Sequence, residues 1–441
     1  MEEAQMDEII SLCKRRGFVY PGSEIYGGLA NSWDFGPLGV ELKNNIKKLW
    51  WRRFVYLRDD MVGMDAAIIL NSKVWEASGH IAHFTDPLIE CKICHQRFRA
   101  DQEDQIKEHE ASHKGKQISW TESKQFNLMY KTFIGSSEDT ANTAYLRPET
   151  AQAIFTNFKN VISSSRVKLP FGIAQIGKAF RNEITPGNYI FRVRELEQME
   201  IEYFIPVPKS DKEWQEHFEY WRQEMREWME KDLGLDSKKI YDHDIPDGER
   251  AHYSKKTIDF EYDFPFGRKE LYGLAYRTDY DLRNHDQKSG KDMKYHDPET
   301  NEEFWPHVIE PSMGLDRSIL AVLSSAYTKD NNRIYMRFKP RLAPCKAAIF
   351  PLLANKPDLV NQAKIIYHSL KEAIDGVVAF DDRGNIGKRY FAQDEIGTPF
   401  CVTIDFTTLE DNTVTVRDRD TTKQKRISKD HLLSYILEKL N

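Results

Sequence analysis

The chain has 441 residues, of which 40% are hydrophobic and 12% aromatic, and a formal net charge of −6. This length exceeds a single compact core and predicts two or three domains, while the apolar content excludes global disorder. The acidic balance excludes a uniformly basic surface, so any nucleic-acid partner would have to bind at local basic patches.

Cysteine usage and hydropathy bear on the location of the protein. Five cysteines are a low and odd count, which argues against a disulfide framework and for a reducing setting. No apolar stretch approaches the roughly 18 residues of a membrane span. Residues 1–7 are acidic and polar, which excludes an ordinary signal peptide. We therefore expect a cytoplasmic protein with no membrane association.

The first 338 residues mix helical and strand-like patterns. Ser210 and Glu213 have the spacing of a capping box at the start of one helix. Residues 185–188 predict a turn between two strands, and residues 286–303 predict a polar loop. Apolar side chains recur at helical spacing in residues 1–20, 39–56, 211–233 and 315–327. Strand-like patterns mark residues 180–183, 191–204, 257–277 and 305–309.

Residues 86–125 interrupt this pattern as a polar insertion with few core residues. The spacing C-x2-C-x14-H-x3-H within it is near that of two-Cys, two-His zinc sites. A structural Zn²⁺ would staple an insertion that has little core of its own. The alternatives are a reduced cysteine pair with solvated histidines, or His95 as a competing ligand. The candidate ligands are Cys91, Cys94, His109 and His113.

The end of the chain has a different pattern. Residues 339–344 predict a linker, because two prolines break any continuing helix. Strands and helices then alternate, which is typical of a small separate α/β domain. The sequence therefore divides into residues 1–338 and residues 341–441.

A charged pattern occupies the two strand-like segments at residues 180–204. It reads F-R-N-E, a short polar turn, and then F-R-V-R-E-L-E-Q-M-E. A mixed-charge strand face is also what an exposed sheet edge would show. The order of residues resembles motif 2 of the class II aminoacyl-tRNA synthetases, at about residues 179–204. The chemistry of that family explains the arginines, because a fixed guanidinium can neutralise the charge that develops when a carboxylate approaches a phosphate.

Two further strings match the same family. The string W-P-H-V-I-E-P-S-M-G-L-D-R ends at Arg317, in the first turn of a predicted helix, where a cation opposes the helix dipole and favours an anionic partner. It resembles motif 3, at about residues 305–323. The string N-S-W-D-F-G-P-L-G from Asn31 resembles motif 1, at about residues 31–70. Three segments are similar to segments of the dimeric glycyl-tRNA synthetases: D-F-G-P-L-G, R-P-E-T from Arg147, and W-E-A-S-G-H ending at His80.

This resemblance implies a fold and an activity. The fold is α/β: an antiparallel-sheet catalytic domain over residues 1–338, interrupted by the 86–125 insertion, and an anticodon-binding domain over residues 341–441. The activity is that of a glycine–tRNA ligase, which forms glycyl-adenylate from glycine and ATP with Mg²⁺ and transfers glycine to tRNA-Gly. The resemblance also implies a homodimer built on motif 1.

It further implies roles for residues that match the family's motifs. Arg181, Glu183 and Arg317 would be catalytic: Arg181 at the α-phosphate, Glu183 at the adenine or holding the hairpin, and Arg317 at the γ-phosphate. Arg192 would reach the distal phosphates. Many members stack adenine on a Phe where this chain has Leu196, which has no flat ring. The implied ATP-binding set is Arg181, Asn182, Glu183, Phe191, Arg192, Val193, Leu196, Glu270, Leu271, Gly314, Leu315, Asp316 and Arg317.

A glycine pocket is implied in the same way. Glu149 would bind the ammonium, and several carboxylates around one ammonium suit a substrate that has no side chain to grip. Lys73 stands where relatives often have Arg at the pocket entrance. The implied set is Lys73, Glu149, Leu196, Gln198, Glu200, Glu310, Ser312 and Gly314.

Two other classes of function compete with this one. A non-catalytic nucleic-acid-binding relative would have lost the motif arginines, but Arg181, Arg192 and Arg317 are all present. An adenylating ligase that does not use tRNA would have no need of the C-terminal domain. The sequence therefore favours the ligase that charges tRNA.

Overall fold

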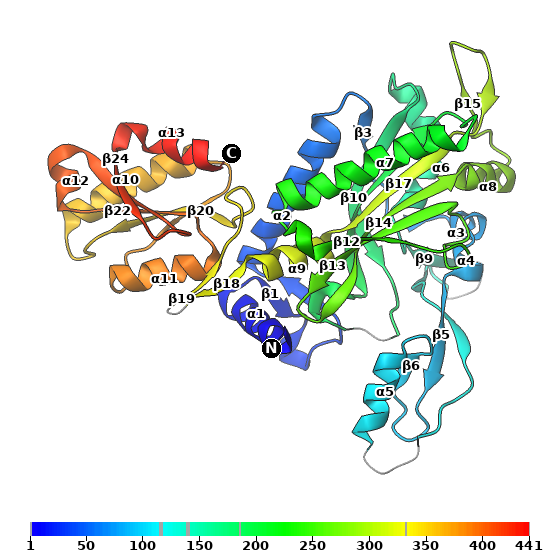
Figure 1. The fold of residues 1–441 in the computed structure, drawn as a ribbon, viewed down its shortest axis with the longest axis horizontal. Helices are drawn as coiled ribbons and strands as arrows, with labels where there is room; N and C mark the ends of the chain where they lie inside the picture. The colour runs from blue at the N-terminus through cyan, green and yellow to red at the C-terminus, as the bar shows by residue number, and fades with distance from the viewer. Residues whose placement is uncertain (1, 114–117, 138–141, 185–186, 331–332, 441) are drawn as a thin grey trace.

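The computed structural model describes residues 2–113, 118–137, 142–184, 187–330 and 333–440. Figure 1 shows a large central body, a C-terminal domain on one side of it, and a slender insertion that projects from the other side. Residues 185 and 186 of the predicted turn, and residues 114–117 of the insertion, lie outside the described residues.

A seven-stranded sheet forms the centre of the body. Its order is β12-β13-β14-β17-β11-β10-β3, and only β10 and β3 run parallel. The mostly antiparallel sheet agrees with the fold class predicted from the sequence. The strands are β3 (Met61–Gly63), β10 (Phe171–Phe180), β11 (Glu195–Ile205), β12 (Ile240–Asp244), β13 (Lys256–Phe264), β14 (Gly267–Thr278) and β17 (His307–Gly314).

The pattern of β11 explains why the two faces of this sheet differ. Met199, Ile201 and Tyr203 alternate along the strand and belong to the largest hydrophobic core. The opposite face carries Glu200 and Glu202, which are buried without being apolar. Buried carboxyl groups are rare outside functional sites, so this second face is where a site is expected.

Helices cover both faces of the sheet. Helices α2, α7 and α9 contribute to the largest core, and α6 and α8 pack in a second core at the end of the polar face. The helices of the body are α1 (Glu2–Arg16), α2 (Pro37–Trp51), α3 (Ser72–Ala77), α4 (His80–His83), α6 (Ala151–Ser164), α7 (Asp211–Glu227), α8 (Tyr280–Ser289) and α9 (Leu315–Ala326).

Short sheets complete the body. They are β1 (Val19–Pro21) with β2 (Trp33–Phe35), β4 (Ile69–Leu70) with β9 (Thr143–Leu146) and β8 (Lys131–Phe133), β15 (Tyr295–His296) with β16 (Glu303–Phe304), and β18 (Tyr327–Asp330) with β19 (Arg333–Met336). Among the described residues, no helix is both long enough and apolar enough to cross a bilayer.

The helix predicted at 39–56 is confirmed, with α2 (Pro37–Trp51) continuing as a π-helical turn over Arg52–Tyr56. Other local predictions were wrong. The side chain of Ser210 makes no capping hydrogen bond, and Glu213 instead accepts one from the backbone of Lys209. The 286–303 segment contains the end of α8 and the β15–β16 hairpin. Strands were predicted at 180–183 and 191–204, but β10 ends at Phe180 and β11 begins at Glu195. Arg181 and Arg192 therefore lie in the connection between β10 and β11.

The C-terminal domain has a five-stranded sheet in the order β21-β20-β22-β23-β24, with its own hydrophobic core. The strands are β20 (Cys345–Pro351), β21 (Val377–Phe380), β22 (Phe400–Ile404), β23 (Thr413–Asp418) and β24 (Gln424–Ser428). The helices are α10 (Pro357–Ala373), α11 (Ile386–Ile396), α12 (Phe406–Asp411) and α13 (Lys429–Leu440).

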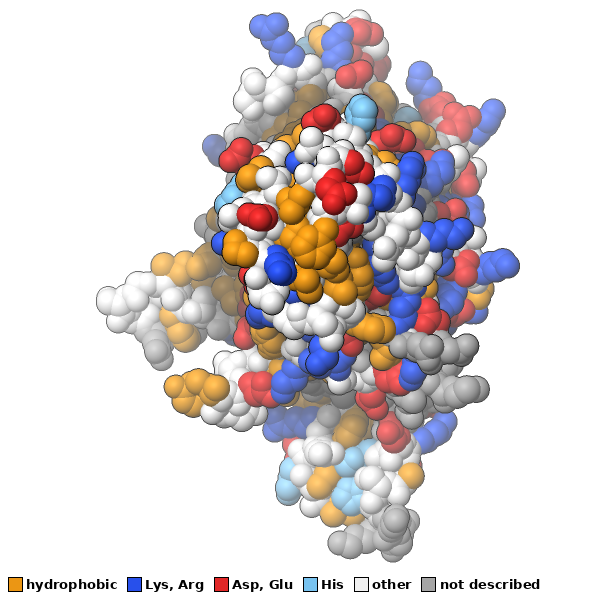
Figure 2. All heavy atoms as spheres, turned by 90° about the vertical axis from the view of Figure 1, so that its left-hand side faces the viewer, with side chains coloured by type: hydrophobic (Ala, Val, Ile, Leu, Met, Phe, Trp, Pro, Cys, Tyr) orange, Lys and Arg blue, Asp and Glu red, His pale blue; other side chains and the backbone are white. Residues whose placement is uncertain are grey.

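Polar contacts join this domain to the body. The Asn45 amide of α2 donates to the carbonyls of Leu342 and Ala343 at 3.2 and 3.1 Å. Arg333 pairs with Asp394 of α11 at 3.1 Å. Figure 2 looks onto the outer end of the domain, where hydrophobic side chains gather near the centre and basic side chains lie along one side.

The insertion is much smaller. It contains a three-stranded sheet in the order β6-β5-β7 and one helix. Its elements are β5 (Thr85–Glu90), β6 (Arg97–Arg99), α5 (Glu103–Ser112) and β7 (Lys124–Asn127).

Candidate active site

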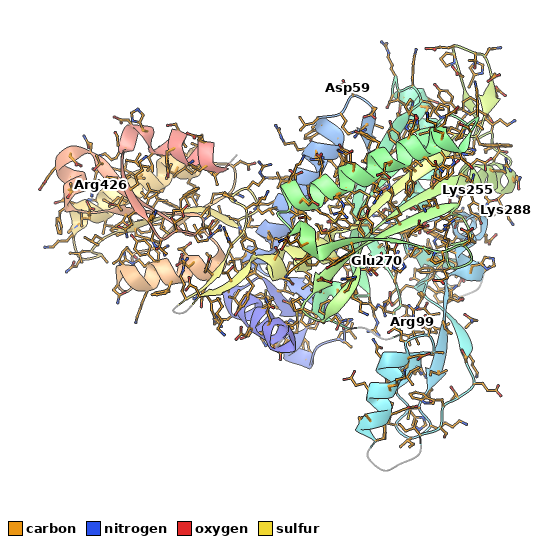
Figure 3. All side chains as sticks on the ribbon, viewed as in Figure 1. Asp59, Arg99, Lys255, Glu270, Lys288 and Arg426 are labelled. Atoms are coloured by element: carbon orange, nitrogen blue, oxygen red, sulfur yellow. The ribbon has the colours of Figure 1, made fainter. Side chains whose placement is uncertain are left out.

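A cavity of about 510 Å³ opens on the polar face of the central sheet. Its walls come from β11, β14, β17, the β10–β11 connection and the start of α9. Arg181, Arg192 and Arg317 all line it, although they are far apart in the sequence. Figure 3 shows Glu270 of β14 above Arg99, a wall residue from the insertion. Three guanidinium groups around one cavity form a site for a polyanion.

Arg181 is held at the end of β10. Its backbone N–H donates to the Arg194 carbonyl at 2.9 Å, and its Nε donates to the Pro148 carbonyl at 3.0 Å. Its guanidinium lies 5.5 Å from the ring centre of Phe84. These contacts fix the guanidinium, and its terminal nitrogens make no hydrogen bond to the described residues, so they can bind a ligand in the cavity.

Arg192 faces both an acid and other cations. Its Nε lies 3.9 Å from Glu183 Oε2. Burial lowers the pKa of Arg192; Glu183 opposes that shift, whereas the charges of Arg99 and Arg317 add to it. A bound anion would relieve this crowding of positive charge.

Arg317 lies in the first turn of α9, where it cannot gain from the helix dipole. Its NH1 pairs with Glu270 Oε1 at 3.1 Å, and the guanidinium lies 4.5 Å from the ring centre of Phe191. The charge of Arg317 lowers the pKa of Glu270 despite burial. The pair keeps both charges at the mouth of the cavity.

Carboxyl groups also line the cavity. Glu149, Glu200 and Glu310 are all buried wall residues. Ser312 Oγ donates to Glu200 Oε1 at 2.9 Å, since the two residues are partners in the β11–β17 register. Both oxygens of Glu310 accept from Arg277 NH1 at 2.9 Å.

Burial and mutual repulsion shift the titration of these groups. Burial, with the neighbouring Glu149, raises the pKa of Glu200. Burial also raises the pKa of Glu310 to about 8, against the charge of Arg277. A cation beside these groups would favour the ionised forms, so the pocket suits a small ammonium group.

Most of the predicted site residues surround this one cavity. Its wall includes, from the ATP set, Arg181, Glu183, Phe191, Arg192, Val193, Leu196, Glu270, Leu271, Gly314, Asp316 and Arg317. It also includes, from the glycine set, Glu149, Leu196, Gln198, Glu200, Glu310, Ser312 and Gly314.

Three predicted residues do not line the cavity. Lys73 is exposed in the first turn of α3. Asn182 is held by its backbone, whose N–H donates to the Leu128 carbonyl at 2.7 Å. Leu315 is fully buried in the main core. A motif match gives the position of a residue in the sequence, but it does not show whether that residue faces the cavity.

Sequence reasoning also missed wall residues. The insertion contributes Asp86 and Arg99, and the segment before β13 contributes Arg250 and Tyr253. The buried Arg277, which orients Glu310, was missed as well. The apolar string Y-G-L-A-Y before Arg277 could have indicated a buried arginine, and a buried arginine needs buried acidic partners.

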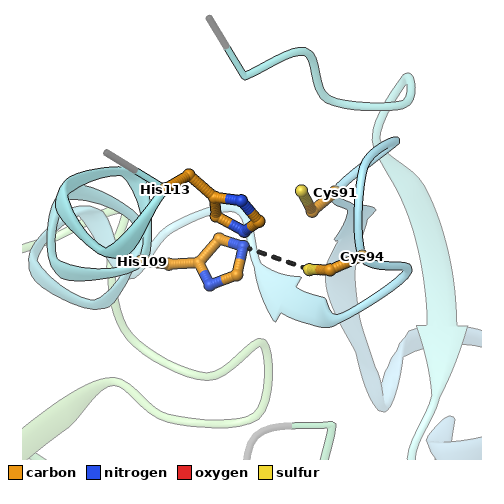
Figure 4. Close-up of side chains that lie close together, drawn as sticks. All are labelled: Cys91, Cys94, His109 and His113. Atoms are coloured by element: carbon orange, nitrogen blue, oxygen red, sulfur yellow. Dashed lines mark hydrogen bonds between the residues drawn. The ribbon is translucent and has the colours of Figure 1, made fainter. Parts of the chain in front are cut away.

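The insertion forms a second candidate centre (Figure 4). Ligand atoms of Cys91, Cys94, His109 and His113 all lie within 4.8 Å of one another. Cys94 Sγ lies 3.5 Å from His109 Nε2. Although burial raises the pKa of Cys91, backbone N–H groups outweigh it and lower the pKa, which favours the thiolate. Two thiols and two imidazoles are a donor set that suits a tetrahedral metal ion.

His95, the competing ligand, lies elsewhere. Its Nδ1 contacts Glu90 Oε1 at 2.9 Å, and its side chain is 75% exposed. The four-residue cluster does not include it. The structure therefore favours the Cys91, Cys94, His109 and His113 set over one that uses His95.

Comparisons with known proteins agree with this geometry. Residues 130–326 match the family described as "tRNA synthetase class II core domain (G, H, P, S and T)", and residues 346–439 match "Anticodon binding domain". A glycine–tRNA ligase of Thermobifida fusca (strain YX) is 52% identical over 462 aligned positions, which cover 99% of this chain and 98% of that protein. The glycine–tRNA ligase of Macrococcus caseolyticus (strain JCSC5402) is 51% identical, with 100% of both chains covered.

Proposed function

Because this chain belongs to the glycine–tRNA ligase family of class II aminoacyl-tRNA synthetases, we propose that it attaches glycine to the 3′ end of tRNA-Gly. The observation that carries the proposal is the meeting of three arginines and three buried glutamates in one cavity. The arginines suit a triphosphate, and the glutamates suit the ammonium of an amino acid.

The reaction has two steps. A carboxylate oxygen of glycine attacks the α-phosphorus of ATP, and an oxygen–phosphorus bond forms as pyrophosphate leaves. A ribose hydroxyl of the tRNA then attacks the glycyl carbonyl carbon, and AMP leaves. Both steps need positioning and charge stabilisation rather than a covalent enzyme intermediate.

The arginines act on the phosphates in this scheme. Arg181 neutralises the charge that develops at the α-phosphate, from a position fixed by the Pro148 carbonyl. Arg192 and Arg317 bind the distal phosphates and the leaving pyrophosphate. The Glu270 carboxylate in the cavity wall would help to hold Mg²⁺, which would supply charge neutralisation at the phosphates. Leu196, Val193 and Leu271 provide an apolar surface for adenine in place of an aromatic ring.

The glutamates select the amino acid. Glu149, Glu200 and Glu310 surround the ammonium, and Ser312 keeps the Glu200 carboxyl in place. Glycine offers no side chain to grip, so selectivity rests on the ammonium contacts and on the walls that would meet any Cβ.

The remaining parts of the chain bind tRNA and a second copy of the protein. The C-terminal domain binds the anticodon region, and the apolar and basic side chains on its outer end suit unpaired bases and phosphates (Figure 2). The motif 1 region forms a homodimer interface, which is supported by its exposed hydrophobic residues Tyr56 and Leu57, which are 75% and 66% exposed. The enzyme works in the cytoplasm.

A structural Zn²⁺ occupies the insertion in this proposal. Cys91 and Cys94 come from the turn after β5, and His109 and His113 come from the end of α5. The metal would tie the turn to the helix in a unit with few core residues.

ATP–pyrophosphate exchange, measured with each amino acid in turn, tests the proposed activity. We expect exchange with glycine only, followed by charging of tRNA-Gly by the same preparation. Exchange that depends on another amino acid, or exchange with no transfer to tRNA-Gly, would contradict the proposal.

A further inference from the structure

A buried hydrogen-bond network lies behind Glu149, outside the cavity wall. His80 Nε2 lies 3.2 Å from Glu149 Oε2, and His80 Nδ1 lies 2.8 Å from Ser78 Oγ. The His80 side chain is only 7% exposed. Because an ionised carboxylate can only accept, the contact requires a proton on Nε2. His80, which is not among the residues that line the cavity, therefore donates to Glu149.

The other oxygen of Glu149 is held from a different element. Gln152 Nε2 donates to Glu149 Oε1 at 3.2 Å and to Asp281 Oδ1 at 2.8 Å. Asp281 in turn accepts from Arg277 at 2.8 and 2.9 Å, and Arg277 holds Glu310. The network thus joins two of the three glutamates of the ammonium pocket and fixes the distance between them.

The helix that carries His80 is itself anchored. Asn127 Nδ2, at the end of β7, donates to the carbonyls of His80 and Ile81 at 3.3 and 3.0 Å. Trp75 packs edge-on against the His80 ring, with centres 5.5 Å apart. The imidazole therefore has little freedom to turn away from Glu149.

We propose that His80 is a positioning residue for glycine recognition, which orients the Glu149 carboxylate that receives the amino acid's ammonium. This inference rests on the proposed function. It adds a residue that touches no substrate and comes from the helix just before the insertion.

Electrostatics agree with this geometry. Burial alone would raise the pKa of Glu149, but the charge and hydrogen bond of His80, with Arg277 and Gln152, hold it well below its usual range. Glu200 and Glu310 lack such a donor from His80, and their pKa values are raised. Glu149 is therefore the glutamate that stays charged in the empty pocket.

The test measures KM for glycine and KM for ATP separately in ATP–pyrophosphate exchange. In His80→Leu we expect KM for glycine to rise about tenfold to a hundredfold, the effect of losing a hydrogen bond to a charged group, with KM for ATP within about twofold. His80→Gln keeps an amide donor near Nε2, and it should restore KM for glycine to within about threefold of wild type.

His83 offers a matched control on the same helix. It is exposed and its ring contacts His252 rather than a glutamate, so His83→Gln should leave both KM values unchanged. If His80→Leu does not fold, Ser78→Ala removes the partner of Nδ1 and should raise KM for glycine about threefold, with KM for ATP unchanged.

Two results would overturn the proposal. One is an unchanged KM for glycine in folded His80→Leu or in Ser78→Ala. The other is a parallel rise in both KM values, which would mark a general structural role. A wild-type enzyme that shows no exchange with glycine would instead refute the proposed function.

Discussion

The active-site cavity and the insertion hold their functional groups in opposite ways. The cavity places charged side chains on a seven-stranded sheet, and buried ion pairs behind it, such as Arg277 with Asp281, are fixed by the surrounding core. The insertion has three short strands, one helix and a cluster of four Cys and His ligands. The cavity is thus preorganised by packing, whereas the proposed zinc site would supply part of the order of the insertion.

This difference also sets how each region responds to change. A substitution in the cavity removes one interaction from a frame that persists, so it should change kinetics more than folding. Loss of the proposed metal would remove a cross-link between Cys91, Cys94, His109 and His113, so it should change the local folding of the insertion first.

The largest expected effect is on the cavity side. Arg181→Ala should lower kcat for glycine-dependent exchange by about a thousandfold, because it removes a preorganised cation from the developing charge. The melting temperature should stay within a few degrees of wild type. Arg268→Ala is the matched control, since Arg268 packs on Tyr241 outside the cavity wall. Comparable losses in both variants would contradict the assignment.

The next effect is on the insertion side. Cys94→Ser should lower bound zinc from about one equivalent to less than about one third, because a thiolate ligand is lost. Proteolysis should then cut within residues 86–125 while the sheet domain survives. His95→Ala is the control and should retain zinc, because His95 pairs with Glu90 outside the cluster. A wild-type protein that binds no zinc would contradict the proposed metal site in the insertion.

The smallest effect is the pH dependence of glycine binding. Glu310 has a pKa raised to about 8, so it is neutral below that pH and ionises as the pH rises. The glycine ammonium favours the ionised form. Binding at neutral pH should therefore release a proton, and KM for glycine should fall severalfold from about pH 6 to about pH 8.

Calorimetry in buffers of different ionisation enthalpy measures that proton directly. Glu310→Gln cannot titrate, so its binding should release less than wild type. A KM for glycine that is flat with pH, with no proton released by wild type, would show that Glu310 is already ionised in the empty pocket.

The sequence predicted the parts of the site that have a local signature. Motif order was enough to bring Arg181, Arg192 and Arg317 to one cavity. It misplaced Arg181 and Arg192 on strands, because the end of a strand is set by its pairing partner and not by its own alternation. Lys73 shows the same limit, since a motif position does not determine the direction of a side chain.

Residues behind the cavity wall could not be predicted in this way. His80 stands in a recognised string, but its contact with Glu149 joins positions 69 residues apart across different elements. Asp281 and Gln152 meet over a still longer separation. Such contacts depend on tertiary packing, which leaves no pattern in the local sequence.

Glu202 of β11 shows what this arrangement means for heat resistance. Its side chain is fully buried, neither oxygen has a hydrogen-bond partner among the described residues, and its pKa is raised well above the usual value. An unsatisfied buried carboxyl weakens a fold by about 1–3 kcal/mol. Replacing Glu202 with an uncharged residue of similar size should therefore raise the stability of the enzyme, and the gain would measure what this one buried acid costs the fold.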